Sequence, residues 1–146
     1  MTTLSGKVNI VSDLQAAKKA QARLMDKIIA LGYGEGPAFA IKLALEEGIN
    51  NAIKHGNGFD ASKSVEIAYN MSHQEVAITI TDQGCGFDPG AIPDPTADEN
   101  LEKPCGRGIM LMRAYMDEVR FNEQGNQVFL LKRNIPDTCG ISEDTS

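Results

Sequence analysis

The segment from about residue 37 to residue 55 constrains the fold of this chain most strongly. Its apolar residues recur at the three- and four-residue spacing of one helix face, and Gly56 and Gly58 follow as typical helix-ending residues. An amphipathic helix is stable only when its apolar face is buried, so this face should lie against a core. The residues expected there are Ile41, Leu45, Ile49, Ala52 and Ile53.

The rest of the chain supplies strands for that helix to cover. The segments "SVEIAYNM" and "EVAITITD" alternate apolar and polar residues on either side of "SHQ", which predicts an antiparallel pair. Helices beside a mixed, mostly antiparallel sheet predict a two-layer α/β sandwich with the helices on one face. The other expected elements are a strand in "GKVNIVSDL", a helix over 13–31 capped by Ser12 or Asp13, a short helix in "GIMLMRAYM" and a strand hairpin around Gly125.

Composition restricts the class of protein. The 146 residues suit one domain over 1–146, and the formal net charge of -6 comes without a basic patch, so we expect no nucleic-acid partner. No apolar run is long enough to span a membrane, and "MTTLSGKVNI" lacks the apolar stretch of a signal peptide. An odd number of cysteines, 3, without CxxC spacing indicates free thiols and a cytoplasmic protein.

One stretch of the chain shows almost no periodicity. Residues 83–105 are rich in glycine and proline and are acidic, and loops of this length are usually lids or disordered. We therefore expect a lid over about 88–105. The tail over 136–146 is polar and is expected to be frayed.

Polar groups gather on the other face of the helix predicted over 37–55. Glu47, Asn51 and His55 are four residues apart and form one stripe, with Lys54 beside it. A solvent-exposed face is one explanation. Adjacent asparagines and Gly48, however, weaken a helix without an evident packing gain, and such violations of local preference occur at functional sites. An amide oxygen suits Mg²⁺, a glutamate suits a general base, and a lysine suits a phosphate.

Two glycine motifs follow along the chain. Asp82 ends a predicted strand and is followed by Gly84 and Gly86, a pattern that permits close approach of a ligand but also describes an ordinary turn. In "CGRGIMLM" two glycines flank an arginine and open a predicted helix, whose first N–H groups and dipole favour an anion. Arg107 either reaches a phosphate there or lies in solvent.

In this order, the motifs resemble those of the GHKL ATPase superfamily, and within it most closely those of the bacterial anti-sigma-factor serine kinases. "EGINNAIKHGN" is similar to their E-x-x-x-N-A-x-x-H-G, and "TDQGCGFDP" is similar to their D-x-G-x-G-F-D. "CGRGIMLMRAYMDEVRF" is similar to their G-x-G segment followed by M-D-E-V. The resemblance spans residues 7–133 and implies a sandwich of the Bergerat type.

The resemblance implies a role for each motif residue. Glu47 would be the catalytic base, whereas Glu46 lies off the polar stripe and suits that role less well. Asn51 would hold the Mg²⁺ that bridges the phosphates of ATP. Asp82 would accept a hydrogen bond from the adenine amino group, and His55 would either bind near the lid or cap the helix. The other nucleotide-binding positions implied are Lys54, Gly84, Gly86, Gly106, Arg107, Gly108 and Ile109.

The same resemblance implies an activity and partners. It describes an ATP-dependent serine kinase that acts as an anti-sigma factor, usually as a homodimer. Such a kinase phosphorylates an anti-anti-sigma partner of the STAS type and regulates a sigma factor by partner switching. The alternative is a non-catalytic, nucleotide-gated module that sequesters a regulatory protein, although the presence of Glu47 favours catalysis. A split histidine kinase fits less well, because no second helical segment presents a phosphoacceptor histidine.

Two features depart from the family pattern. The final hairpin often carries a Gly-Thr pair whose hydroxyl supports the adenine-binding aspartate through water, whereas this chain has "GNQV". Asn126 or Gln127 is the candidate substitute. Cys85 and Cys105 flank the predicted lid, but their spacing lacks the ligand pairing of a zinc site. We further expect the apolar residues of the short helix to be core and His73 to be exposed; the former are Met110, Leu111, Met112 and Met116.

Overall fold

A computed structural model describes residues 3–84 and 104–134, with side chains from residue 110 onward in the second segment. The described strands form a 5-stranded sheet in the order β1-β2-β3-β5-β4. Their bounds are β1 Thr3–Val11, β2 Ser64–Ser72, β3 Glu75–Thr81, β4 Glu118–Phe121 and β5 Gln127–Arg133. The helices are α1 Leu14–Ala30, α2 Glu35–Asn51 and α3 Pro104–Tyr115, and a π-helical turn, η1 Ala52–Gly56, continues α2.

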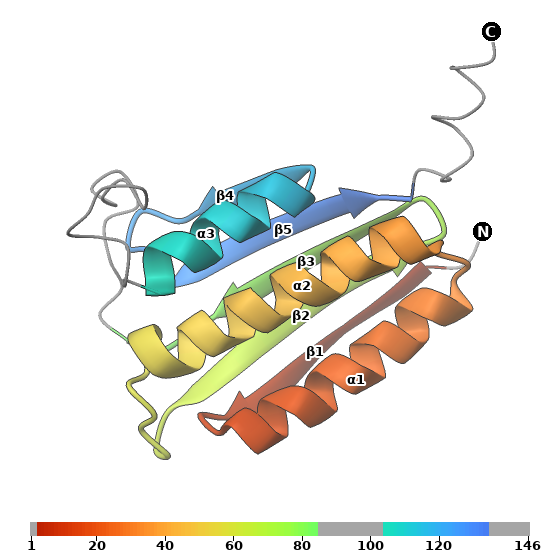
Figure 1. Ribbon diagram of the computed structural model, residues 1–146. Coiled ribbons are helices and arrows are strands. Elements are labelled where there is room, and N and C mark those ends of the chain that lie inside the picture. Colours follow the sequence, from red (N-terminus) through yellow and green to blue (C-terminus); the bar gives the residue numbers. More distant parts are fainter. Residues whose placement is uncertain (1–2, 85–103, 135–146) are drawn as a thin grey trace, which may run out of the picture.

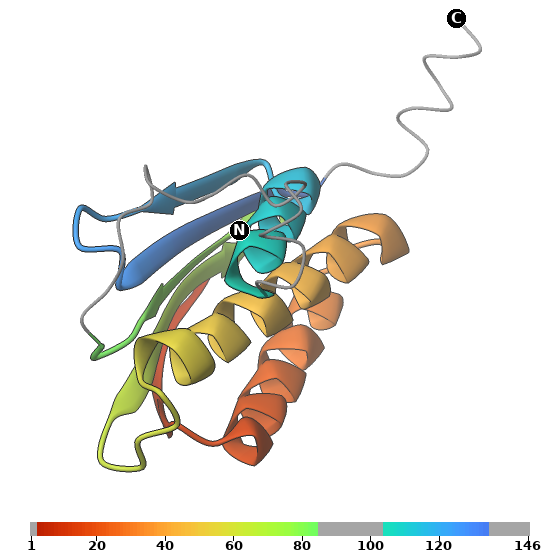
Figure 2. The same ribbon diagram turned by 60° about the vertical axis from the view of Figure 1, so that its left-hand side comes forward.

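Helices α1, α2 and α3 all lie on one face of this sheet, as both views show (Figures 1 and 2). Every pairing between the described strands is antiparallel. The predicted two-layer α/β sandwich is therefore confirmed. The chain reaches β4 at the sheet edge through α3, and β5 then inserts between β3 and β4.

The local sequence explains how the first helix begins. Asp13, and not Ser12, is the N-cap of α1: its carboxylate accepts a hydrogen bond from the backbone N–H of Gln15 at 3.3 Å. Ser12 is buried and donates instead to the carbonyl of Lys63 at 2.9 Å. The end of β1 is thereby tied to the start of β2.

The core lies between the helices and the sheet. Alternate residues of β2 and β3 face it, and Ile80 pairs with Val128 of β5, so these strands bury one side of their alternating pattern. All of the helix residues expected to be buried are buried: Ile41, Leu45, Ile49, Ala52 and Ile53 are each at most 5% exposed.

Gly48 has a packing reason that the sequence did not reveal. The expectation that it weakens α2 without a packing gain is wrong, because a Cβ at this position would lie 2.7 Å from Cδ1 of Ile80. The same Cβ would lie 3.6 Å from Sδ of Met112 on α3. Gly48 therefore lets α2 approach both the sheet and α3, and its helix-weakening effect is offset by closer packing.

The short helix is longer than expected and not wholly core. Helix α3 begins at Pro104, and proline is favoured in the first turn of a helix because its missing N–H has no partner there anyway. Met112 and Met116 are buried, as expected, and Leu111 is half-buried. Met110 is 47% exposed, so the expectation of a core position is wrong for it, because it points off the face that packs on α2 and the sheet. Most of the predicted lid, and the predicted tail, lie outside the described residues.

We predict that Gly48→Val destabilises the fold by about 1–3 kcal/mol, the usual cost of overpacking a core. The added methyl groups must displace Ile80 or Met112, which are buried. Urea unfolding measures the change. Gly36→Val is the matched control, since Gly36 is exposed on the same helix. An equal loss for both variants would show that helix propensity, and not the contact with Ile80, determines the effect.

Candidate nucleotide-binding site

The predicted motifs meet at one end of the sandwich. The C-terminal end of α2, the end of β3 and the beginning of α3 lie together at the left of Figure 1. Helix α2 packs on α3. Glu47 and Asn51 occupy consecutive turns of α2 on one face, and both are half-buried. The structure thus brings these two residues toward the same end as Asp82.

The last turn of this helix is not α-helical. The N–H of Asn57 donates to the carbonyl of Ala52 at 2.8 Å, five residues back, which is the π-helical pattern. A π-turn holds more residues than an α-turn, so His55 does not follow Asn51 by one full turn as the four-residue spacing assumed. Lys54 and His55 both lie in this turn and are exposed. Single π-turns are often found at functional sites.

Asp82 is the buried carboxylate of the site. It directly follows β3, is 9% exposed, and accepts a hydrogen bond at Oδ1 from the N–H of Gly84 at 2.8 Å. Burial raises the pKa of Asp82, while the Gly84 hydrogen bond and the charge of Lys63 oppose that rise. No described residue donates to Oδ2, so this oxygen can accept from a ligand.

Two glycines make room for this carboxylate. A Cβ on Gly56, at the end of η1, would overlap the carboxyl group of Asp82. A Cβ on Gly84 would overlap the backbone carbonyl of Gly56. Gly84 was predicted to leave room for a nucleotide base. In the structure, its missing Cβ leaves room for the backbone carbonyl of Gly56. Gly86 lies outside the described residues.

Asn57 is a buried residue that the sequence reasoning missed. It is 3% exposed, and its side-chain amide donates to Oγ of Ser12 and to the carbonyl of Ser64, both at 2.9 Å. Its Oδ1 accepts from the N–H of Gln83 at 2.8 Å. The sequence predicted no role for Asn57, because an asparagine between glycines gives no signal that it will be buried.

The hairpin between β4 and β5 supports Asp82 through the backbone. The carbonyl of Asn126 accepts from the N–H of Asp82 at 2.9 Å, and its side-chain amide donates to the Asp82 carbonyl at 3.4 Å. The side chain of Gln127 donates to Oγ1 of Thr81 at 3.0 Å. Neither candidate substitute for the family threonine therefore contacts the Asp82 carboxylate.

The second glycine motif lies within α3. Gly106, Arg107, Gly108 and Ile109 fall in the first half of this helix, so the expected helix start is present two residues before Gly106. Only the backbone of these residues is described, and contacts of the Arg107 side chain with phosphate remain a prediction. Cys85 and Cys139 lie outside the described residues, and the part of the chain that is described contains no metal-binding cluster of three or more His, Cys, Asp or Glu.

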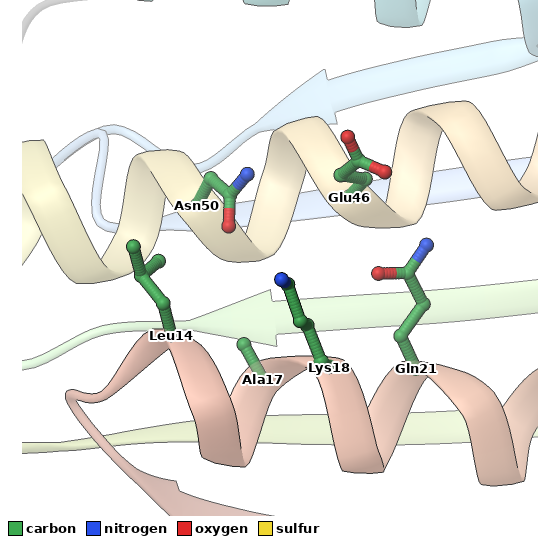
Figure 3. A pocket seen from close by; sticks show the side chains of 6 residues that line it. All are labelled: Leu14, Ala17, Lys18, Gln21, Glu46 and Asn50. Atoms are coloured by element: carbon green, nitrogen blue, oxygen red, sulfur yellow. The ribbon is translucent and has the colours of Figure 1, made fainter.

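The two glutamate–asparagine pairs of "EEGINN" face different neighbours. Glu46 and Asn50 line a hollow of about 140 Å³ between α1 and α2, opposite Lys18 and Gln21 of α1 (Figure 3). Glu47 and Asn51 do not line it. Adjacent helix positions are about 100° apart, so a one-residue shift places the same two residue types in a different groove.

Comparison with known proteins decides the family. Residues 10–132 match the histidine kinase-like ATPase domain. The chain belongs to this family. This match confirms the resemblance drawn from the three motifs.

No helix in the described part of the chain combines the length and the apolar character that crossing a membrane requires.

The chain is also similar to individual curated proteins, which are named as serine-protein kinases and anti-sigma factors. The chain is 28% identical over 111 residues to the serine-protein kinase RsbW of Oceanobacillus iheyensis, covering 72% of this chain and 70% of the relative. It is 31% identical over 99 residues to the anti-sigma F factor of Clostridium perfringens, covering 64% of this chain and 70% of the relative. It is also 29% identical to RsbW of Bacillus subtilis over 111 residues, 70% of this chain and 68% of the relative.

A solved structure supports the fold. The RsbU and RsbW domains of a Mycobacterium tuberculosis protein match 90% of this chain with a TM-score of 0.60 at 17% identity. The match covers 33% of that longer chain, so it supports the arrangement of the elements only.

We predict that Asp82→Asn raises stability at neutral pH while it weakens nucleotide binding. A carboxyl group whose pKa is raised by folding destabilises the folded state at every pH at which the group is ionised. This cost disappears as the pH falls through the folded pKa toward the ordinary value of 3.8. The gain in melting temperature should therefore be largest at neutral pH and shrink on acidification. Thermal melts over a pH series measure it.

Asp60→Asn is the control, because it should change the melting temperature in the opposite direction. Hydrogen bonds from Ser62 lower the pKa of Asp60, so its charge stabilises the folded state above 3.8, and its loss should lower the melting temperature at neutral pH. That loss should also fade in acid, as the wild-type carboxyl group becomes protonated. A lower melting temperature for Asp82→Asn at neutral pH would contradict the cost assigned to the buried charge.

Proposed function

We propose that this protein is an ATP-dependent serine-protein kinase that acts as an anti-sigma factor. The observation that carries the proposal is the buried Asp82 carboxylate, which has one oxygen bonded to Gly84 and the other open to a donor, at the end of α2 that bears Glu47 and Asn51. The names of the curated relatives, serine-protein kinase RsbW and anti-sigma F factor, agree with it.

Adenine is the base that fits this carboxylate. A carboxylate oxygen accepts hydrogen bonds and cannot donate them, so Asp82 favours the exocyclic amino group of adenine over the carbonyl oxygen of guanine. The burial of Asp82 strengthens this selection, because an unpaired buried acceptor next to a carbonyl group is costly.

Glu47 and Asn51 have the chemistry to act on the phosphates. Among the described residues neither side chain has a hydrogen-bond partner, although both are half-buried, so both remain available to a ligand. Asn51 presents an amide oxygen that suits Mg²⁺, and bound Mg²⁺ would neutralise charge on the phosphates of ATP. Glu47 would orient the attacking serine hydroxyl and accept its proton.

The remaining predicted groups complete the proposal. Lys54 is exposed and can reach out toward a phosphate, and the first N–H groups of α3 present partial positive charge to the same ligand. We propose an anti-anti-sigma protein of the STAS type as the phosphoacceptor, and a sigma factor as the second partner. We further propose that the protein is a cytoplasmic homodimer.

We predict that Glu47→Ala binds ATP with near-normal affinity but no longer transfers phosphate. The base acts on the hydroxyl and not on the nucleotide, so binding and transfer should separate. Titration calorimetry gives the affinity, and labelled ATP with a STAS-type partner gives phosphoserine. Glu46→Ala is the matched control, since Glu46 faces α1, and it should retain transfer.

The outcome also separates the kinase from its alternative. If the wild-type protein binds ATP and a regulatory partner without forming phosphoserine, it is a nucleotide-gated binding module. A loss of ATP affinity in Glu47→Ala as large as that in Asp82→Ala would contradict the role given to Glu47.

We predict that Asn51→Ala weakens ATP binding only when Mg²⁺ is present. Removing one metal ligand should lower the affinity about tenfold or more, as loss of groups that position metal ligands does. Titrations with Mg²⁺ and with EDTA measure the difference, and Asn50→Ala, which alters the α1 side of the same helix, is the control. An identical loss with and without the metal would count against the ligand role.

A further inference from the structure

We propose that Asn57 is a positioning residue that sets the adenine selectivity of the site. This inference rests on the proposed function, in which Asp82 binds the amino group of adenine. Asn57 does not touch the Asp82 carboxylate; it fixes the next peptide unit, through the hydrogen bond from the Gln83 N–H to its Oδ1 at 2.8 Å.

Hydrogen bonds hold the backbone on both sides of Asn57 in place. Its own N–H is bonded to Ala52, and the N–H of Phe59 is bonded to the carbonyl of Ile53 at 2.9 Å, so the π-turn fixes the backbone on both sides. Gly58 and Phe59 then both adopt left-handed backbone conformations, with φ of 58° and 60°. A non-glycine residue in this conformation is uncommon and persists only where its surroundings enforce it.

Three hydrogen bonds hold the side-chain amide of Asn57 in place. Its nitrogen donates to Ser12 and Ser64, and its oxygen accepts from Gln83. These partners also fix the orientation of the amide, because the carbonyl of Ser64 can only accept and the N–H of Gln83 can only donate. A buried amide satisfied in this way does not rotate without losing several hydrogen bonds at once.

The Gln83 peptide lies between the two groups that shape the base-binding oxygen. It joins Asp82 to Gln83, and the next peptide carries the N–H of Gly84, which donates to Oδ1 of the same carboxylate and leaves Oδ2 without a donor among the described residues. On its other side, the turn is held by Ser64, whose N–H donates to the Gln83 side chain at 2.6 Å, and by Asn126, which binds both backbone groups of Asp82. Asn57 is the buried side-chain contact from the α2 side of the site.

Loss of this contact should therefore have a specific effect. If the Gln83 peptide rotates, the Gly84 N–H shifts relative to Oδ1, and Oδ2 no longer points in one direction. Contacts of the nucleotide with Asn51 or α3 do not depend on that turn. The penalty should fall on the hydrogen bond to the adenine amino group and spare the phosphates.

The experiment compares ATP with purine riboside triphosphate, which lacks the adenine amino group. Affinities are measured by calorimetry for the full chain with Mg²⁺, in the wild type and in Asn57→Ala, Asp82→Ala, the double variant and Ser12→Ala. Ser12→Ala is the matched control, because it removes a contact of the same amide on the side away from Asp82. Circular dichroism checks that each variant is folded, and Asn57→Ser replaces Asn57→Ala if the latter does not fold.

In Asn57→Ala we expect ATP affinity to fall about five- to tenfold, the size of one lost hydrogen bond, with less than about a twofold change for the analogue. Ser12→Ala should keep the wild-type ratio of the two affinities. The double variant should bind ATP no more weakly than Asp82→Ala does.

Equal losses for both nucleotides, or an unchanged ratio, would overturn the positioning role while leaving the function of Asp82 intact. A wild-type protein that binds both nucleotides equally, or an Asp82→Ala variant with an unchanged ratio, would overturn the proposed adenine recognition itself and the role of Asn57 with it.

Discussion

The close contact between the end of α2 and the buried carboxylate of Asp82 determines the arrangement of this end of the molecule. The carboxylate can be buried only because Gly56 has no Cβ, and the following turn fits only because Gly84 can pass the carbonyl of Gly56. An ionised group in this position destabilises the folded state, which is why its pKa is raised. The cost is offset by the packed core of the two-layer sandwich, and the result is an acceptor ready for a ligand.

The architecture was predictable from the sequence because its signals are periodic. The alternation in β2 and β3, the apolar face of α2 and the glycine at 125, which has φ of 75°, each correspond to a single simple geometry. The three motifs were also recognisable together, since their order and spacing are specific even though each alone is weak. The roles of Glu47 and Asn51 remain proposals that rest on their position and on the family.

What the sequence did not reveal depends on contacts between distant segments. Gly48 resembled a helix defect because the side chain that requires it, Ile80, is far along the chain. No role was predicted for Asn57 because its partners come from the turn after β1, from β2 and from the turn after β3. Asn126 was considered as a support for the Asp82 carboxylate, but it binds the Asp82 backbone, a distinction that requires coordinates. The π-turn was likewise invisible, because no residue type marks the change from four- to five-residue hydrogen bonding.

The adjacent pairs in "EEGINN" have a consequence for how such a domain can diversify. Glu46 and Asn50 border the groove shared with α1, whereas Glu47 and Asn51 lie outside it. Substitutions in the first pair can alter what that groove accommodates without disturbing the residues proposed for chemistry. A single helix can therefore accumulate changes along one edge while the other stays under constraint, which allows related domains to acquire new recognition preferences around an unaltered reaction centre.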